Sequence, residues 1–557
     1  MQKQINIAAL FILLAFYASC KKGDDGGGTV PVATPLLLTG MRINNIVVTS
    51  STINNNVAPT AALRLRFNNK VNRATVLPGS IILTETGAST VAYNVSYENF
   101  DSTIVVTSSS LKYLTKYALT TGPIKSVNGG ALASTVNLPF STGMDSSRKF
   151  PAITDDALLT KIQEQTFKYF WDFAHPTSGL SRERNTSGDV VTSGGSGFGI
   201  MAIPVGINRN FITRAQGLQR MQTIVAFLKN TAVKVKGAFP HWLNGATGAI
   251  VPFSATDNGA DLVETSYLIM GLLTVRQYFN GADAAETALR SDINSIYNNV
   301  EWDWFRQGNQ QALYWHYSIN NGWAMNMQIR GWNECLITYV MAASSTTHGI
   351  PPSVYTAGWK GGSQFINGNT YYGLTLPLGP PQGGPLFFSH YSFLGINPNS
   401  LTDAAANYTT QTKNHTLINY NYCKANPMNY YGYSDSVWGL TASDIQNGYT
   451  ASSPTNDVSV IAPTAALSSM PFTPNESMAA LKFYYYVLGD KLFKEYGFVD
   501  AFSLHNTWFA SSFLAIDQGP ILLMIENHRT GLLWSLFTSC PEVKTGMLSL
   551  GFSAPYL

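Results

Sequence analysis

Charged side chains are scarce in this chain of 557 residues. Asp, Glu, Lys and Arg together make up 12% of the sequence, about half of the usual share, and the formal net charge is only +3. No long run of Lys or Arg occurs. Because binding to a phosphate backbone needs clustered positive charge, this composition disfavours nucleic acid as a partner.

Metal-binding and redox motifs are also missing. The four cysteines lie far apart without C-x-x-C spacing, and the eight histidines are scattered without an H-E-x-x-H motif. We therefore expect no metal site, no disulfide framework and no cofactor. After residue 20 no stretch contains about 18 consecutive apolar residues, so no further membrane span is expected.

The glycine-rich segment 193–199 matches neither of the common glycine-rich catalytic motifs. It lacks the Gly-Lys-Ser/Thr of a P-loop, and Phe198 stands where a G-x-S-x-G elbow requires glycine. No parallel-sheet pattern surrounds the segment. We expect either a loop that contacts substrate or a tight entry into a helix.

The first 20 residues have the features of an export signal. Lys3 precedes an apolar run that is too short for a permanent membrane span. The closing Tyr-Ala-Ser-Cys, which ends at Cys20, resembles the lipobox of bacterial lipoproteins and implies acylation of that cysteine. We expect residues 21–36 to form a flexible tether and lipid alone to anchor the protein to the bacterial outer membrane, on its periplasmic or cell-surface face. An ordinary signal peptide is the alternative.

Residues 37–143 show the two-residue alternation of half-buried strands. Leu63, Leu65 and Phe67 alternate with arginines, and similar short runs recur between turn residues. About seven strands in about 110 residues predict a β-sandwich. The segment resembles the immunoglobulin-like modules of secreted bacterial enzymes. We expect a spacer or docking role, because no acid pair or aromatic cluster marks the segment as catalytic.

From residue 151 to residue 557 the apolar spacing becomes that of helices. Several of the predicted helices are apolar on nearly every face, which favours a mainly α fold with two concentric helix layers, an (α/α) toroid. Long polar loops would then build a cleft at its rim. The predicted helices are Leu158–Phe173, Thr213–Leu228, Leu262–Phe279, Ala284–Tyr297, Asn333–Ala343, Ala404–Tyr422, Met478–Leu488 and Gly519–Phe537.

Acidic residues stand where three of these helices begin. Asp257, Asp261 and Glu264 surround the start of one helix, and they would share one face if that helix extended back to Asp257. Glu334 and Asp517 open two other helices. Inner helices of a toroid all begin at the same end, so we expect these acids to converge on one mouth. Helix capping is the alternative for each acid taken singly.

Aromatic residues with polar neighbours gather in the loops around these acids. Aromatic faces stack on the C–H faces of sugars, while His and Arg side chains supply hydrogen bonds to hydroxyl groups. For any single tryptophan, packing in the core is the alternative. The set predicts a glycan cleft formed by His241, Trp242, Trp315, His316, Tyr317, Arg330, Trp332, His390, Tyr391 and Trp438.

The chain from Thr166 to its C-terminus resembles glycoside hydrolase family 144, the bacterial glucoamylase-like domain. The matching blocks extend over about 390 residues and include GAFPHWLNG (237–245), DNGADLVETSYLIMGLL (257–273), IRGWNECLITYV (329–340) and LAIDQGPILLMIENHRTGLLW (514–534). The resemblance implies an (α/α)6 toroid that hydrolyses β-1,2-glucan or sophorooligosaccharides with inversion.

The resemblance also implies roles for the acids. Glu334 matches the position of the general acid, and Asp517 and Asp261 both match acids that could serve as the base. Asp257 and Glu264 would line the pocket with the aromatic set. In an inverting enzyme the two catalytic carboxyl groups lie about 6.5–9.5 Å apart. We expect the protein to act as a monomer.

Alternatives to an endo-acting β-1,2-glucanase stay open at this point. An exo-acting relative would release or transfer sophorose or glucose, and a surface glycan-binding lipoprotein would hold glycan without cutting it. Helical toroids also occur among polysaccharide lyases, so the fold alone does not exclude elimination.

Overall fold

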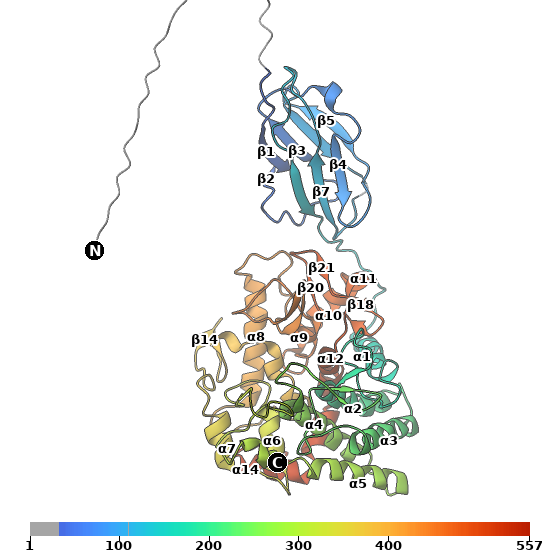
Figure 1. Cartoon of the computed structure of the whole chain (residues 1–557), viewed down its shortest axis with the longest axis vertical. Helices are drawn as coiled ribbons and strands as arrows, with labels where there is room; N and C mark the ends of the chain where they lie inside the picture. Colours follow the sequence, from blue (N-terminus) through green and yellow to red (C-terminus); the bar gives the residue numbers. More distant parts are fainter. Residues whose placement is uncertain (1–32, 110) are drawn as a thin grey trace, which may run out of the picture. The chain divides into compact units, whose positions relative to one another are not determined.

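The structure, a computed structural model, describes residues 33–109 and 111–557 and divides them into two compact units (Figure 1). The smaller unit comprises 33–52, 60–109 and 118–139, and the larger one comprises 53–59, 111–117 and 140–557. Cys20, the predicted acylation site, lies outside the described residues. None of the helices in the described ranges combines the length and the apolar character that crossing a membrane requires.

The smaller unit is built around two sheets, whose strand orders are β2-β1-β3-β6-β5 and β4-β7-β8. The predicted alternation is confirmed in β3, where Leu63, Leu65 and Phe67 are buried and Arg66 is exposed. The strands are β1 (Leu38–Ile43), β2 (Ile46–Val48), β3 (Leu63–Phe67), β4 (Ile81–Glu85), β5 (Asn94–Glu98), β6 (Thr103–Thr107), β7 (Lys116–Thr121) and β8 (Asn137–Ser141).

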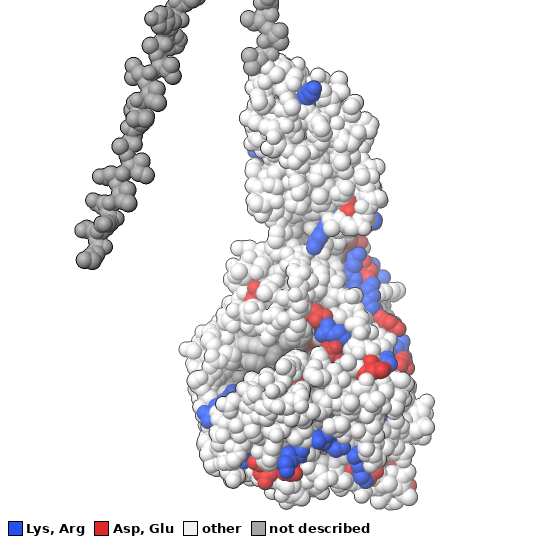
Figure 2. All heavy atoms as spheres, viewed as in Figure 1, with Lys and Arg blue, Asp and Glu red and all other residues white. Residues whose placement is uncertain are grey.

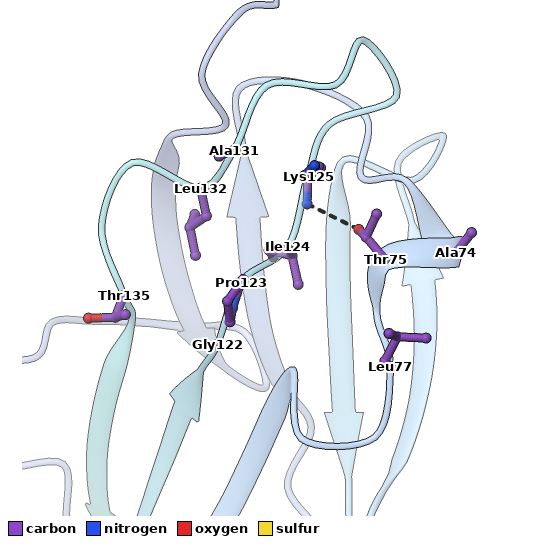
Figure 3. Close-up of a pocket in the computed structure, with 10 residues that line it drawn as sticks. All are labelled: Ala74, Thr75, Leu77, Gly122, Pro123, Ile124, Lys125, Ala131, Leu132 and Thr135. Atoms are coloured by element: carbon purple, nitrogen blue, oxygen red, sulfur yellow. Dashed lines mark hydrogen bonds between the residues drawn. The ribbon is translucent and has the colours of Figure 1, made fainter.

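A pocket of about 430 Å³ opens in this smaller unit (Figure 3). Leu77, Ile124 and Leu132 supply apolar lining, and Lys125 is the charged residue in it. The backbone N–H of Lys125 donates a hydrogen bond of 3.0 Å to Oγ1 of Thr75, which ties two sides of the pocket together. The lining contains neither Asp nor Glu, so the pocket offers no carboxyl pair for acid/base chemistry.

The larger unit is mainly helical, as the sequence predicts. Its longer helices are α1 (Asp155–Trp171), α2 (Ser193–Asn208), α3 (Arg214–Asn230), α4 (Leu262–Tyr278), α5 (Ala284–Asn298), α6 (Leu336–Ser344), α8 (Tyr408–Ala425), α10 (Pro474–Tyr486), α12 (Ala515–Thr530), α13 (Leu532–Thr538) and α14 (Pro541–Ser549). Shorter helical turns are α7 (Pro352–Val354), α9 (Pro463–Leu467) and α11 (Gly489–Leu492).

Short strands connect these helices. They are β9 (Val190–Thr192), β10 (Trp242–Asn244), β11 (Ile250–Val251), β12 (Gly259–Asp261), β13 (His316–Ser318), β14 (Thr370–Tyr371), β15 (Leu374–Thr375), β16 (Ala442–Ile445), β17 (Gly448–Ala451), β18 (Phe493–Lys494), β19 (Gly497–Phe498), β20 (Phe502–Ser503) and β21 (Trp508–Phe509). Two of the pairs that they form, β12-β13 and β16-β17, carry residues of the site described below.

Inner and outer helices differ in how much of their surface is buried. Helices α2, α4 and α12 are buried along nearly their whole length, whereas α3 and α5 keep an exposed face. Helix α2 packs against both α4 and α12, and α4 packs against α6. In Figure 1 α2 and α4 lie toward the middle of the unit, and α3 and α5 lie nearer its edge. This layering agrees with the prediction from apolarity.

Glycines explain how two segments singled out in the sequence fold. The segment 193–199 forms the first turns of α2, so a helix entry is confirmed and a substrate-contacting loop is not observed. A Cβ on Gly197 would lie 2.3 Å from the carbonyl oxygen of Tyr267, so glycine is needed for α2 and α4 to touch. The predicted helix Gly519–Phe537 is wrong, because Gly531, with a φ of +68°, separates α12 from α13.

Candidate active site

Asp257, Asp261 and Glu264 do not share one continuous helix. Asp257 lies in a loop, Asp261 ends strand β12, and Glu264 lies in the first turn of α4. Oδ1 of Asp261 accepts hydrogen bonds of 2.9 Å from the backbone N–H groups of Val263 and Glu264, and thereby caps α4. The predicted helical face is therefore wrong, whereas capping by Asp261 is confirmed.

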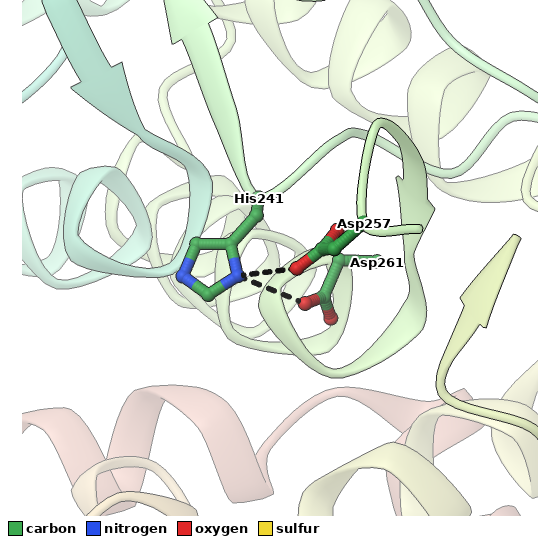
Figure 4. A group of neighbouring side chains, drawn as sticks. All are labelled: His241, Asp257 and Asp261. Carbon is green, nitrogen blue, oxygen red and sulfur yellow. Dashed lines mark hydrogen bonds and ion pairs between the residues drawn. The ribbon is translucent and has the colours of Figure 1, made fainter. Parts of the chain in front are cut away.

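Two histidines bridge the carboxylates of Asp257 and Asp261, and Figure 4 shows one of them, His241. Nδ1 of His241 lies 3.2 Å from Oδ2 of Asp257 and 3.3 Å from Oδ2 of Asp261. Strand β13 places His316 opposite Asp261 in the β12-β13 pair. Its Nε2 lies 3.5 Å from Oδ2 of Asp257 and 3.4 Å from Oδ2 of Asp261. We call these four residues the His–Asp cluster.

Mutual attraction sets the charges in the His–Asp cluster. Burial alone would lower the pKa of both histidines, but neighbouring carboxylates outweigh burial and raise both values, that of His241 well above its usual range. Burial would likewise raise the pKa of Asp261. Hydrogen bonds and positive charge from His241 and His316 instead hold it far below its usual value. Near neutral pH the cluster is therefore an ion-paired network.

Aromatic rings surround this cluster. The indole N–H of Trp315 donates a hydrogen bond of 3.2 Å to Oδ2 of Asp261, and its ring stacks on His316 at 5.5 Å between centroids. Phe253, which the sequence analysis did not single out, stacks on His241 at 4.2 Å and is 51% exposed. Trp242 packs edge-on against Phe253. The predicted residues Trp242 and Trp315 thus lie beside the acids.

Glu264 is held by α2 rather than by a capping box. Its Oε2 accepts hydrogen bonds from the N–H of Gly194 at 2.7 Å and from Oγ1 of Thr192 at 3.1 Å. A Cβ on Gly194 would lie 2.6 Å from Oε2 of Glu264, so only glycine permits this approach. Burial raises the pKa of Glu264, and the charge of Asp261 adds to the rise.

Glu334 stands just before α6, in surroundings that favour its protonated form. Burial raises the pKa of Glu334 to about 7, and the negative charges of Asp261 and Glu264 add to this rise. Its backbone carbonyl accepts hydrogen bonds from Oγ of Ser392 at 2.5 Å and from the hydroxyl of Tyr267 at 3.4 Å. The N-cap position of α6 is Cys335, and the N–H of Ile337 in the first turn donates a hydrogen bond of 3.0 Å to Oγ of Ser392, so Glu334 does not cap this helix.

Asp517 lies inside the first turn of α12 and does not cap it. Within the described part of the chain, neither of its carboxyl oxygens has a hydrogen-bond partner, although the residue is only 1% exposed. Burial raises the pKa of Asp517 well above its usual value, and the neighbouring Asp500 raises it further. The alternative, that Asp517 is only an N-cap, is therefore wrong.

Asp500 and Asp444 lie behind Asp517, and neither was predicted from the sequence. Oδ2 of Asp500 accepts a hydrogen bond of 2.6 Å from the N–H of Asp444. The guanidinium of Arg184 lies 3.2 Å from both carboxylate oxygens of Asp444. Burial raises the pKa of Asp500 to about 7. Arg184 therefore neutralises Asp444, while Asp500 and Asp517 face each other without a cation between them.

Tyr391 connects the two groups of acids. Burial raises the pKa of its hydroxyl, and the negative charges of Asp517, Glu334 and Glu264 add to that rise. The three acids are far apart in the sequence, yet their charges all act on this one hydroxyl. Figure 2 shows a broad hollow in the larger unit with mostly uncharged visible walls. The convergence of helix-start acids on one mouth stays a prediction, supported by their common effect on Tyr391 and by the effect of Asp261 and Glu264 on Glu334.

Three predicted glycan contacts are core residues instead. Trp438 is 0% exposed and its indole N–H donates to the carbonyl of Glu476 at 3.3 Å. Trp332 is 3% exposed and packs against other aromatic rings, and Nε2 of His390 pairs with Oγ of Ser469 at 2.9 Å. Because these three side chains are buried, the prediction that they contact glycan is wrong. Arg330 is exposed, so it remains free to meet a ligand.

The His–Asp cluster also has the donors that a divalent cation accepts. One nitrogen of His241 and one carboxylate oxygen each of Asp257 and Asp261 lie within 4.8 Å of one another. The structure therefore offers a candidate metal position where the sequence predicts none. Because the pKa values of His241 and His316 are raised, their protonated imidazoles can balance the charge of the same carboxylates without a metal ion.

Two family models match this chain. The Glycoamylase model, described as “Putative glucoamylase”, matches residues 326–541, and a bacterial Ig-like domain model matches residues 43–142. An endo-β-1,2-glucanase from Chitinophaga pinensis, solved with sophorotriose and glucose, is 50% identical, with a TM-score of 0.71 over 73% of this chain and 100% of that one. The chain belongs to this glucoamylase-like family.

Other relatives of this glucoamylase-like protein come from Parabacteroides distasonis. The crystal structure of a β-1,2-glucanase is 36% identical, with a TM-score of 0.70 over 94% of this chain and 74% of that one. An exo β-1,2-glucooligosaccharide sophorohydrolase that acts at the non-reducing end is 45% identical over 418 residues, or 71% of this chain. The chain spans 58% of the length of that curated relative.

Of the site residues that were not predicted in this glucoamylase-like protein, some could have been recognised in the sequence and others could not. Asp500 lies between Val499 and Ala501. An acid within an apolar run indicates a buried carboxyl group, so Asp500 could have been predicted as a site residue from the sequence. Asp444 and Arg184 carry no such signal, because their pairing joins positions 260 residues apart. Phe253 was not predicted, because the loop that carries it lacks the pattern of aromatic residues next to His, Asn or Arg.

Proposed function

We propose that the protein is an inverting glycoside hydrolase of family 144 that cleaves β-1,2-glucan, with Glu334 as its general acid. The raised pKa of Glu334, about 7, carries this proposal, because a general acid must still hold its proton near neutral pH. Two relatives named as β-1,2-glucanases support the substrate. The proposed fold of the catalytic domain is an (α/α)6 toroid.

In the proposed mechanism Glu334 gives its proton to the glycosidic oxygen, directly or through a substrate hydroxyl, as the bond to the anomeric carbon breaks. A water molecule attacks that carbon from the opposite face, and its proton passes to a carboxylate. Asp517 is a better candidate for this base than Asp261. Both oxygens of Asp517 lack partners among the described residues, whereas Asp261 is held by a helix cap, Trp315 and two histidines.

The positions of the other groups suggest how substrate is held. The His–Asp cluster keeps Asp257 and Asp261 fixed, because each carboxylate is within 3.5 Å of both imidazoles. The exposed face of Phe253 and the partly exposed Trp242 and Trp315 offer surfaces for sugar rings. We also propose export, lipid attachment at Cys20, a monomeric state and a spacer role for the Ig-like unit.

Exo cleavage is the second candidate for the same site. The sophorohydrolase that is 45% identical favours it, since that relative acts from the non-reducing end. An endo enzyme needs a cleft that is open at both ends, and an exo enzyme needs one end closed. The endo mode is our first choice because the C. pinensis endoglucanase is matched over 100% of its length.

Digestion of β-1,2-glucan tests these proposals together. Samples are taken over time, their products are separated by size, and the newly formed anomer is observed by NMR before it equilibrates. We expect mixed oligosaccharides early and α-configured reducing ends. Sophorose alone at all times would replace the endo mode with the exo mode, and a β product would rule out inversion. No cleavage overnight would indicate a binding protein, and an unsaturated product that absorbs ultraviolet light would indicate a lyase.

A further inference from the structure

We propose that a second pocket in the helical unit, the tryptophan pocket, binds a neutral β-1,2-glucan segment away from the catalytic acids. The tryptophan pocket is lined by Trp304, Trp323, Glu301, Asp303, Gln307 and His348, among others. The identity of the sugar rests on the proposed function. The pocket itself rests on the separate observations that follow.

The tryptophan pocket has the size and the walls of a sugar site. Its volume is about 400 Å³, which is within the range of small-ligand pockets. Trp304 and Trp323 are both partly exposed, and their ring centroids lie 4.8 Å apart with 34° between the planes. Two exposed indoles at one opening provide the flat apolar surface on which the C–H face of a pyranose packs.

Polar groups stand beside these indoles in a fixed arrangement. Nδ1 of His348 lies 3.2 Å from Oδ1 of Asp303, and Nζ of Lys236 lies 3.2 Å from Oε2 of Glu301. Over the ranges that the structure describes, Oε1 of Gln307 is buried and has no hydrogen-bond partner. A buried acceptor without a donor is costly, and a sugar hydroxyl would supply that donor.

The backbone of one wall is strained. Gln307, Gly308 and Asn309 are consecutive residues with φ values of +44°, +80° and +66°. Non-glycine residues rarely adopt this left-handed conformation, and such strain tends to collect at ligand sites. The strained turn places Gln307 and the two indoles around one opening.

The charges of the tryptophan pocket favour a neutral ligand. Its two carboxylates would repel an anion, which excludes phosphorylated or uronate ligands. Nζ of Lys236 pairs with Glu301, and Nδ1 of His348 lies 3.2 Å from Oδ1 of Asp303, so both carboxylates already have partners within the protein. The remaining chemistry consists of hydrogen-bond acceptors next to indole faces, which suits sugar hydroxyl groups.

Strand β13 separates the tryptophan pocket from the catalytic acids. Successive side chains of a strand point to opposite sides, and His316 faces Asp257 and Asp261. The next residue, Tyr317, packs its ring against Trp304 at 4.9 Å and against Trp323 at 5.0 Å. The two sites therefore lie on the two sides of one strand, and a long glucan could engage both.

Binding stoichiometry tests the proposal. The full chain carrying Glu334→Gln, which should not consume ligand, is titrated by calorimetry with a β-1,2-glucooligosaccharide of about five glucose units. We expect two sites in this background and one site after Trp323→Ala is added. Trp508→Ala, which removes a partly exposed tryptophan from β21, is the matched control and should keep two. Gln307→Leu should weaken the second site at least about fivefold, consistent with one lost hydrogen bond.

The outcomes separate failure of this proposal from failure of the proposed function. One site that Phe253→Ala weakens and Trp323→Ala does not would overturn the tryptophan pocket and leave the catalytic cleft intact. No binding in the Glu334→Gln background would overturn the substrate assignment and the pocket together. Should Trp323→Ala fail to fold, an unchanged second site in Gln307→Leu would still overturn the proposal.

Discussion

The His–Asp cluster and the acids Glu334, Asp500 and Asp517 are both sets of buried carboxyl groups, yet their protonation differs. In the cluster two imidazoles lie within 3.5 Å of each carboxylate, and the pKa of Asp261 falls. In the second set neither Asp517 nor Glu334 forms an ion pair among the described residues, and burial raises both pKa values, although the charge of Arg184 partly opposes the rise at Asp517. The comparison shows that the neighbours of a buried acid, more than its place at a helix start, decide its charge.

This division fits the two tasks of a hydrolase site. Ion-paired groups can orient sugar hydroxyls, whereas Glu334, which keeps its proton near neutral pH, can deliver it. The predictions below remove members of one set or the other, and the last tests whether a metal ion belongs to the His–Asp cluster. The order runs from the largest expected effect to the smallest.

Removal of the proton donor should have the largest effect. We expect Glu334→Gln to lower kcat/KM for β-1,2-glucooligosaccharides by about 10³-fold, because general acid catalysis contributes 10²–10⁴-fold. Glu164→Gln removes an exposed acid from α1 and is the matched control. Turnover within about threefold of wild type would contradict the role of Glu334.

Removal of one imidazole should destabilise the folded protein in a defined pH window. The folded-state pKa of His241 is raised. The stabilisation that His241 gives the folded protein is therefore complete below about pH 6.5 and is lost as pH rises. The folded-state pKa of Asp261 is lowered. The stabilisation that Asp261 gives the folded protein is therefore complete above about pH 4 and is lost in acid. We expect His241→Asn to reduce the free energy of unfolding by about 2 kcal/mol between these limits.

Urea unfolding of wild type and His241→Asn across pH measures this window. The difference between the two proteins should shrink on both sides of it. A difference that does not vary with pH would show that lost packing, and not ion pairing, explains the effect.

Removal of Asp500 should change the pH profile. With Asp500→Asn the negative neighbour of Asp517 is gone, so the pKa of Asp517 falls and the acid limb of kcat/KM moves to lower pH. We expect a shift of about one pH unit and a loss of about tenfold at the plateau. Asp490→Asn, at an exposed position in α11, is the control. If the acid limb of kcat/KM does not move, Asp500 does not control the pKa of Asp517.

Glu334→Gln should also stabilise the protein at alkaline pH, which is opposite to the effect of His241→Asn. The folded pKa of Glu334 is raised to about 7 from 4.5, so the folded state loses stability as pH rises between these values. A neutral amide avoids that loss. We expect a gain of about 1 kcal/mol in the free energy of unfolding at pH 8 and none at pH 4. A constant gain would contradict ionisation as its cause.

Chelation should have the smallest effect. If the imidazoles are the counter-charges of Asp257 and Asp261, dialysis against EDTA should leave kcat within about twofold of its starting value. Elemental analysis of the purified protein accompanies the assay. A bound divalent ion together with loss of activity on its removal would show that the His–Asp cluster is a metal site.

Local patterns predicted the elements well and the contacts between them less well. The helix at Leu262–Phe279 agrees with α4 (Leu262–Tyr278) to one residue, because an apolar run with a polar cap is a local feature. Glu334 and Asp517 were singled out by their positions at helix starts and by the family resemblance, and in the structure the charges of both act on Tyr391. Trp332 and Trp438 were misassigned, because a tryptophan in a loop motif looks the same whether its ring faces solvent or the core.

The sequence by itself determined a β unit followed by a helical unit, and it determined that acids stand where inner helices begin. Hydrophobic periodicity and capping act over a few residues, so they can be recognised in the sequence. Only the tertiary structure decided which acids meet histidines and which meet one another. Charge depends on distances of a few ångströms between residues such as Asp261 and His316, which are 55 positions apart in the chain, and no local pattern specifies those distances.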